Sequence, residues 1–153
     1  MMVFSFFDNS GVIYQHYAAV GAKVNAEYTI DVLAAFDKSL KKKRPELVQR
    51  EWFFHFDNAP THTAKVIKEW LARKKYNVLP QAPYSPDLAP ADFFFFPKVK
   101  DVIAGTLIEG NSVRTEWERA VNTIPTDEFR AAFDKWLERC SKCIDIGGGY
   151  VEK

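Results

Sequence analysis

Two short hydrophobic runs open the chain, and their spacing predicts a β-hairpin. Val3 to Phe7 and Val12 to Tyr17 are rich in aromatic and β-branched residues, which favour strands. The four residues between them, Asp8 to Gly11, are of the types that form tight turns. We therefore expect two paired strands at the start of the chain.

The pattern then changes to steps of three and four residues, which indicates an amphipathic helix. Hydrophobic residues recur from Ala26 to Leu40, Asn25 precedes them as an N-cap candidate, and Pro45 follows as a stop. The cationic run Lys41 to Arg44 lies at the end of this helix. It is either a solvated helix end, which suits the negative pole of the helix dipole, or a patch that contacts phosphate groups.

The middle of the chain predicts a strand, a helix and a second strand. Trp52 to Phe56 is a continuous aromatic run, typical of a strand buried on both faces. A helix is expected over Thr61 to Lys75 and a strand over Tyr76 to Leu79. This order predicts a parallel pair of strands and so an α/β fold. The inner stripes of the helix are expected at Val66 and Trp70 and at Ile67 and Leu71.

The last third of the chain predicts a loop and three helices. Four prolines between Pro80 and Pro90 favour a stiff, extended loop. Phe93 to Ala104 is typical of a helix that kinks at Pro97, and two more helices follow Ser112 and Thr126. The inner faces of these two helices are expected at Val113, Trp117, Ala120, Val121 and Ile124, and at Phe129, Phe133, Trp136, Leu137, Cys140 and Ile144. A small sheet with about five helices is the result.

Composition narrows the class of protein further. The chain has 153 residues, 47% of them hydrophobic and 15% aromatic, which predicts one domain with a packed core rather than a disordered chain. Its net charge is only +1, which excludes a uniformly basic nucleic-acid coat but leaves regional binding open. The hydrophobic runs are far shorter than the ~20 residues that cross a bilayer. With two Cys and no leader pattern, we expect no membrane and a reducing compartment.

Two aspartates stand where chemistry is expected. Asp57 follows the aromatic strand and Asp92 begins the helix after the proline loop. Two carboxylates at such positions form an oxygen-rich site suited to Mg²⁺ or Mn²⁺, the ions used in two-metal phosphoryl transfer. Aspartate is also a common helix cap, so spacing alone leaves both interpretations open.

The residues around these acids decide between the two interpretations. Thirty-four residues separate Asp57 from Asp92. The motifs are His55-Phe56-Asp57-Asn58-Ala59-Pro60-Thr61-His62 and Tyr84-Ser85-Pro86-Asp87-Leu88-Ala89-Pro90-Ala91-Asp92-Phe93. In motif and spacing the chain resembles the mariner family of transposases, within the mariner/Tc1 group, and the likeness continues through Lys43-Arg44-Pro45-Glu46-Leu47 and Trp136-Leu137-Glu138-Arg139-Cys140.

The resemblance implies a fold, an activity and a site. The fold would be α/β and ribonuclease-H-like, as in retroviral integrases, with a mixed sheet and flanking helices, and residues 1–153 would form part of the transposase catalytic domain. That domain cuts DNA at transposon ends and joins them to target DNA, using Mg²⁺ or Mn²⁺ held by three aspartates. Asp57 and Asp92 match the second and third of these catalytic, metal-binding residues. The resemblance also implies DNA as partner, a homodimer as candidate assembly, and a nuclear location.

The resemblance also shows departures. The family's first aspartate and its helix-turn-helix region would lie before Met1, and Asp8 falls in a turn, so we expect a chain truncated at its N-terminus. The strands at Val3 and Trp52 would then flank a missing central strand or pair directly with each other. We expect the chain alone to be inactive and to bind DNA weakly, with salt sensitivity and without sequence preference. Whether it is an enzyme by itself stays open; the alternative is a non-catalytic DNA-binding or partner-binding protein derived from a transposable element.

Three smaller signals favour structural roles. Cys140 and Cys143 have metal-like spacing but lack a second pair, so core packing is the expectation. His55 and His62 flank Asp57 and are expected to be structural rather than to orient substrate or water. Phe93 to Phe96 is expected to bury a helix start rather than to stack on bases.

Overall fold

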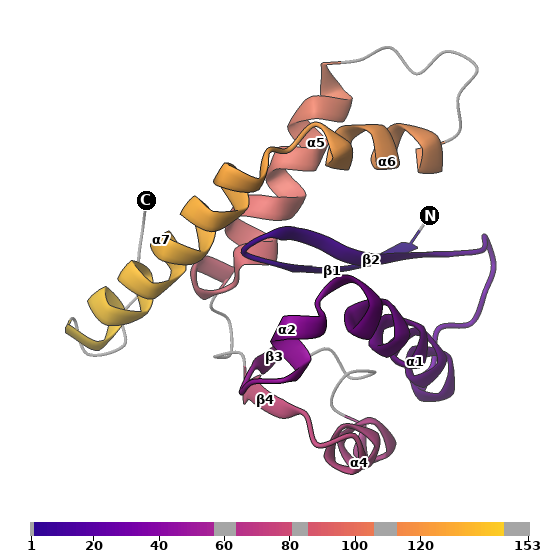
Figure 1. Cartoon of the computed structure of the whole chain (residues 1–153). Coiled ribbons are helices and arrows are strands. Elements are labelled where there is room, and N and C mark those ends of the chain that lie inside the picture. Colours follow the sequence, from indigo (N-terminus) through magenta and orange to yellow (C-terminus); the bar gives the residue numbers. More distant parts are fainter. Residues whose placement is uncertain (1, 57–63, 81–85, 106–112, 146–153) are drawn as a thin grey trace. The chain divides into compact units, whose positions relative to one another are not determined.

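The chain divides into two compact units. The computed structural model describes residues 2–56, 64–80, 86–105 and 113–145, leaving aside the side chains of 80, 86 and 143–145. The first unit comprises Met1–Phe7 and Val12–Pro83, and the second comprises Asp8–Gly11 and Tyr84–Lys153 (Figure 1). That residues 1–153 make up one partial domain stays a prediction.

The N-terminal hairpin is confirmed. Strands β1 (Met2–Asp8) and β2 (Gly11–Ala18) pair in one sheet. In the turn, Asp8 Oδ1 accepts a hydrogen bond from the Ser10 N–H at 2.9 Å. Gly11 then takes a φ of +121°, a region that residues with a Cβ rarely adopt. The turn residues therefore account for the sharp reversal of the chain.

Helix α1 (Ala26–Lys43) is also confirmed with its cap. The Asn25 side chain accepts a hydrogen bond from the Tyr28 N–H at 2.9 Å, which satisfies one of the unpaired donors of the first turn. Pro45 does end the helix, but it also begins the single-turn helix α2 (Pro45–Val48), because proline is preset for the first helical position. The buried face of α1 carries Val32, Leu33, Phe36 and Leu40.

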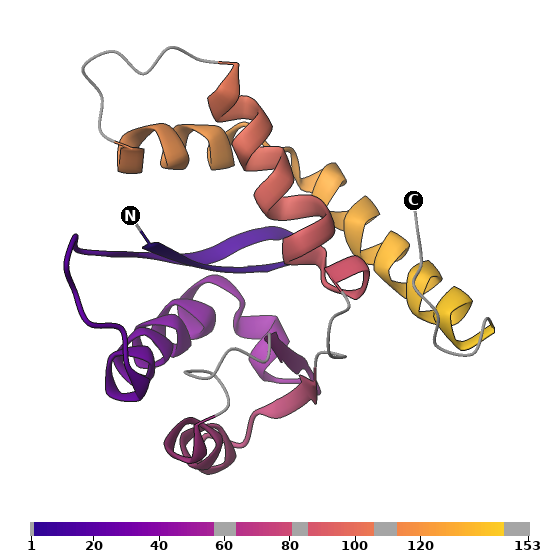
Figure 2. The same cartoon turned by 180° about the vertical axis from the view of Figure 1, so that it is seen from behind.

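The predicted parallel pair of strands is present. Strand β3 (Phe53–Phe56) pairs in parallel with β4 (Asn77–Pro80), with Phe53 opposite Asn77. Helix α4 (Lys65–Arg73) connects them and lies beside α1 in both views (Figures 1 and 2). The first residues of the predicted helix, 61–63, lie outside the described residues.

Two expectations about burial in this region were wrong. Phe54 is only 9% exposed, whereas the neighbouring Phe53 is 60% exposed. Successive strand residues face opposite sides, and Phe54 is the one that packs against Phe36 of α1, at 5.7 Å between ring centroids. On α4, Val66 is 48% exposed because the buried stripe runs through Ile67, Trp70 and Leu71 instead.

The strands of the first unit form two separate pairs. Among the described strands, β1 pairs with β2 alone and β3 with β4 alone, so direct pairing of β1 with β3 is not found there. The two pairs meet instead through aromatic side chains. The Phe6 ring stacks on Phe36 at 4.4 Å and lies 6.4 Å from Phe54. Helix α1 therefore supplies the centre of the first core.

The second unit is helical. The 3₁₀ turn η1 (Pro86–Leu88) shows that the prediction of an extended loop was wrong at this point. A single π-helical turn, η2 (Ala91–Phe95), runs directly into α5 (Phe96–Ala104), so the predicted irregularity near Pro97 is confirmed. Helices α6 (Val113–Asn122) and α7 (Thr126–Asp145) follow. No described helix has the length and hydropathy needed to span a membrane.

The hydrophobic periodicity predicted some residues of the last two helices to be buried that are in fact exposed. Val113 is 53% exposed and Leu137 is 70% exposed, although both were expected inside. Buried residues of the described part of the second unit include Ala89, Phe95, Val99, Trp117, Ala120, Val121, Ile124, Phe129 and Ala132, joined by the charged Asp87, Glu116 and Arg139. Three charged side chains therefore occupy positions where sequence alone favours hydrophobic ones.

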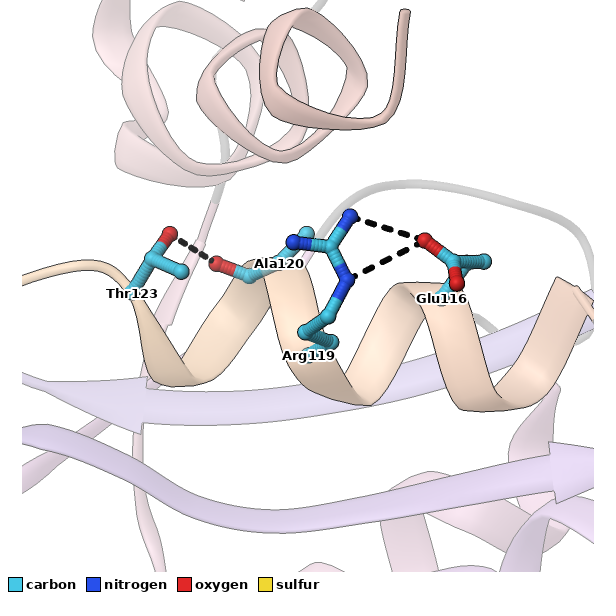
Figure 3. Close-up of polar contacts among 4 residues, drawn as sticks. All are labelled: Glu116, Arg119, Ala120 and Thr123. Carbon is cyan, nitrogen blue, oxygen red and sulfur yellow. Dashed lines mark hydrogen bonds and ion pairs between the residues drawn. The ribbon is translucent and has the colours of Figure 1, made fainter. Parts of the chain in front are cut away.

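Helix α6 pairs its buried carboxylate locally. Glu116 is 2% exposed, and its Oε2 accepts hydrogen bonds from Arg119 Nη2 at 2.8 Å and Nε at 3.2 Å (Figure 3). One turn later, the Thr123 hydroxyl donates to the Ala120 carbonyl at 2.6 Å. A buried charge costs several kcal/mol unless it is paired, so the pairing with Arg119 offsets part of the cost of burying Glu116.

Candidate active site

Asp92 lies on the π-helical turn η2. The Ala89 carbonyl accepts hydrogen bonds from the N–H groups of both Asp92 and Phe93, at 2.9 and 3.0 Å. The turn closes when the Phe96 N–H donates to the Ala91 carbonyl, five residues back. The N–H groups of Asp92, Phe93 and Phe96 are thus all hydrogen-bonded, while the Asp92 side chain is exposed.

The π turn explains why this carboxylate is exposed at all. In a regular α-helix, positions 92, 95, 96 and 99 share one face, because they are spaced by three, four and seven residues. Phe95 and Val99 are completely buried on that face. The wider turn shifts Asp92 off the buried stripe, and such turns occur frequently at functional sites.

The phenylalanines next to Asp92 anchor the turn in the core. The Phe95 ring lies 6.4 Å from Trp117, and the Phe94 ring lies 5.4 Å from Phe129, edge to face. This confirms core packing over base stacking for this aromatic run. Asp92 is consequently held by neighbours that cannot move without opening the second core.

Arg139 of α7 braces the same segment from another side. It is only 6% exposed, its guanidinium carbon lies 4.2 Å from the centroid of the Phe93 ring, and its Nη1 donates to the Asp87 carbonyl at 3.2 Å. It thereby contacts the chain on both sides of Asp92. Sequence reasoning missed this residue. The signal was its spacing, since Arg139 continues the helical stripe of Phe129, Ala132 and Trp136.

The other predicted site residues are only partly described. Asp57 and His62 lie outside the described residues, and β3 ends one residue before Asp57. The convergence of Asp57 with Asp92 therefore stays a prediction. His55 is half-buried within β3, and Cys140 is half-buried on α7, while the Cys143 side chain is not among those described. In the described part of the chain, no three His, Cys, Asp or Glu residues gather closely enough to hold a metal.

The donor chemistry of Asp92 nevertheless fits a hard cation. Mg²⁺ and Mn²⁺ prefer carboxylate oxygens, and they retain several water ligands, which demands an accessible donor. Asp92 offers an exposed carboxylate on a turn fixed by backbone hydrogen bonds and buried aromatics. This residue can therefore supply one ligand, with Asp57 as the proposed second.

A polar cluster in the first unit was also missed. Asp37 of α1 is 7% exposed; its Oδ1 accepts a hydrogen bond from the Tyr76 hydroxyl at 2.6 Å, and its Oδ2 lies 3.0 Å from Lys41 Nζ. Burial alone would raise the pKa of Asp37, but Tyr76, Lys41 and the charge of Lys74 outweigh it and hold that pKa below its ordinary value. Burial and the Asp37 carboxylate together raise the pKa of Tyr76. This cluster ties α1 to the start of β4.

The chain is similar in sequence and in fold to the Mos1 mariner transposase. The chain is 34% identical over 154 residues to the Mariner Mos1 transposase of Drosophila mauritiana, covering 99% of this chain and 45% of that protein. The Mos1 transposase catalytic domain, solved with raltegravir and Mn, superposes with a TM-score of 0.89 at 32% identity, covering 98% of this chain and 76% of that one. A Mos1 paired-end complex with the left transposon end gives a TM-score of 0.87 at 32% identity, covering 98% and 44%. No family model matches the chain.

These likenesses define the class of protein. The fold is α/β and ribonuclease-H-like, as the resemblance implied. The chain belongs to the mariner family of transposases and corresponds to part of their catalytic domain. It spans less than half the length of the curated Mos1 relative.

Proposed function

We propose that this chain contributes to the catalytic core of a mariner-type DNA transposase, which cleaves and transfers DNA strands. The observation that carries the proposal is the exposed Asp92 carboxylate on a π turn braced by Arg139 and buried aromatics, within a chain of this family. The related Mos1 structures contain Mn in one case and a transposon end in another. DNA ends and target DNA are accordingly the proposed partners, a homodimer the proposed assembly, and the nucleus the proposed location.

The proposed chemistry needs Asp57 and Asp92 as ligands for Mg²⁺ or Mn²⁺. Such ions supply Lewis-acid stabilisation of the attacking and leaving oxygens of the phosphodiester. The residues of this chain keep the Asp92 carboxylate in position. The Ala89 carbonyl, the buried Phe95 ring and the Arg139 guanidinium each restrain the turn that carries Asp92. A preorganised ligand of this kind avoids the cost of reorganisation when the metal binds.

Metal binding is the first test. Mn²⁺ titration of the chain, followed by electron paramagnetic resonance, should give a site that weakens by tenfold or more in Asp57→Asn and in Asp92→Asn. Asp101→Asn removes an exposed carboxylate from α5, one helix further along, and should leave the affinity unchanged. Mn²⁺ binding that is indifferent to both Asp57 and Asp92 would contradict the proposal.

Cleavage is the second test, and it separates the catalytic from the non-catalytic reading. Little or no nicking of transposon-end DNA with Mn²⁺ is expected from the chain alone, and any nicking that occurs should depend on Asp57 and Asp92, and not on Asp101. Asp57- and Asp92-dependent Mn²⁺ binding with no cleavage under any condition would favour the alternative, a DNA-binding or partner-binding protein derived from such an element.

A further inference from the structure

A strong charge asymmetry lies within the first unit. Residues 37–51 and 65–75 together hold eleven Lys and Arg against four Asp and Glu, a net charge of +7. Because the whole chain is only +1, the remaining residues carry −6. The overall neutrality therefore conceals a concentrated cationic region.

The fold brings two separate cationic runs of this region together. Lys42 and Lys43 lie at the C-terminal end of α1, and Lys74 and Lys75 lie directly after α4, the helix that packs beside α1. Asp37 connects them, because it binds Lys41 through one oxygen and the hydroxyl of Tyr76, the residue after Lys75, through the other. Lys74 lies close enough to Asp37 to lower the pKa of that carboxyl. We call the four exposed lysines at positions 42, 43, 74 and 75 the basic surface.

The negative ends of the two helix dipoles are too weak to account for this concentration of positive charge. Each helix C-terminus presents a partial charge of about −0.5, so α1 and α4 together offset about one positive charge. The four carboxylates of these residues, Asp37 among them, are already counted in the net charge of +7. Glu46 and Glu51 are the nearby carboxylates that follow α1, and both are exposed to solvent. Several positive charges therefore remain without a compensating negative charge. Such a local excess of positive charge is typical of a surface that binds a polyanion.

The backbone at Lys75 is a second, independent observation. Its φ is +59°, in the left-handed region, and the helix end has the hydrogen bonds of a Schellman motif: Tyr76 N–H to Leu71 carbonyl and Lys75 N–H to Ala72 carbonyl, both at 3.0 Å. Glycine is the residue favoured at this position, and a side chain here is a source of strain. The chain nevertheless carries a lysine there, which places one more cation beside Lys74.

We propose that the basic surface binds the phosphate backbone of duplex DNA, without reading its sequence and without the metal site. The proposal rests on the proposed function for its choice of DNA among polyanions. Lysine ammonium groups on two adjacent helix ends suit phosphates, which attract point charges from any base sequence. The surface would hold DNA on the first unit, independently of the carboxylate of Asp92.

The test is the salt dependence of DNA binding by the full chain. Fluorescence anisotropy with a 20-base-pair duplex of arbitrary sequence is measured in EDTA between about 50 and 200 mM salt, where each phosphate contact adds about −0.9 to the slope of log K against log salt. The fourfold Lys→Gln variant of the basic surface should bind at least ~10-fold more weakly at the lowest salt, with a slope smaller by about 2 to 4. Each pairwise variant, at 42 and 43 or at 74 and 75, should show about half of that loss.

A matched control separates a surface from a general charge effect. Gln in place of Lys100, Arg130, Lys135 and Lys142, all exposed in the second unit, changes the net charge equally and should leave affinity and slope nearly unchanged. Equal loss in this control, no loss in the basic-surface variant, loss from only one of the two pairs, or equal competition by polyglutamate would overturn the proposal. Circular dichroism verifies that each variant is folded.

The two proposals can fail separately. Asp92→Asn should bind duplex DNA normally in EDTA if the basic surface acts alone. If the basic-surface variant binds as tightly as the parent while Mn²⁺ binding still depends on Asp57 and Asp92, only this inference fails. If Mn²⁺ binding is indifferent to those aspartates while the salt slope depends on the four lysines, only the proposed function fails.

Discussion

Removing the phenolic hydroxyl of Tyr76 should destabilise the first unit by about 1.5–3 kcal/mol, the usual contribution of a hydrogen bond to a charged group. The hydroxyl donates to Asp37 Oδ1 at 2.6 Å, and the carboxylate is 7% exposed. In Tyr76→Phe, Asp37 retains Lys41, but that side chain is 63% exposed, and exposed ion pairs contribute at most about 1 kcal/mol. The lost hydrogen bond should therefore appear almost undiminished in the free energy of unfolding.

A double-mutant cycle measures this interaction directly. Tyr76→Phe, Asp37→Asn and the double variant are unfolded in urea at pH 7, and hydrogen exchange of the α1 peptide assigns the change to the first unit. We expect a coupling energy of about 1–2 kcal/mol between the two positions. Tyr14→Phe removes a hydroxyl from another half-buried tyrosine of the same unit and should cost less. A coupling energy below about 0.5 kcal/mol would refute the view that this hydrogen bond joins α1 to β4.

Three further outcomes are expected. Lys75→Gly should raise the free energy of unfolding by about 0.5–1 kcal/mol in thermal unfolding, because φ is +59° at this position. Lys74→Gly, at a φ of −81°, should lower it. A change of the same sign in both variants would contradict the strain argument. The pKa of Asp37 is held below its ordinary value of about 4, so its contribution to stability is complete above about pH 5 and is lost as the pH falls through the native pKa. In urea unfolding at several pH values, Asp37→Asn should therefore lose less stability toward acid pH than the parent chain. Arg139→Ala should cost about 2–4 kcal/mol and speed hydrogen exchange over residues 87–96, and rescue by Lys should be incomplete because an ammonium cannot stack on Phe93 in the same way. Unchanged exchange in that segment would mean that Arg139 does not brace Asp92.

Local signals in the sequence predicted most of the elements. The hairpin follows from the turn residues Asp8 to Gly11, helix α1 from its stripe and the Asn25 cap, and the parallel strands from the alternation of patterns around α4. Each depends on residues close together in the chain, whose preferences are visible in order. The family resemblance added the ribonuclease-H-like fold, which periodicity alone could not specify.

The features that could not be predicted depend on long-range partners. Phe53 and Leu137 are hydrophobic yet exposed, because which face of an element is covered depends on elements distant in sequence. Arg139 and Asp37 are buried although they are charged, because Phe93 stacks on the Arg139 guanidinium and Tyr76 donates a hydrogen bond to Asp37, and both partners are distant in the sequence. The candidate site likewise has one feature that the sequence predicted and one that it did not. Asp92 was found from its motif, whereas the π turn that exposes it has no signature in residue type.

That π turn also changes how this segment tolerates insertion and deletion. It acts as one extra residue inside a helix, placed between an acid that faces solvent and the phenylalanines that face the core. Deleting Phe93 or Phe94 would remove that extra residue together with one aromatic ring, and in the regular helix that results Asp92 and Phe95, then two positions apart, would still point about 160° away from each other. A shorter segment would therefore keep the carboxylate off the buried stripe, whereas a segment of unchanged length that closed into a regular α-helix would turn it toward Phe95 and the core.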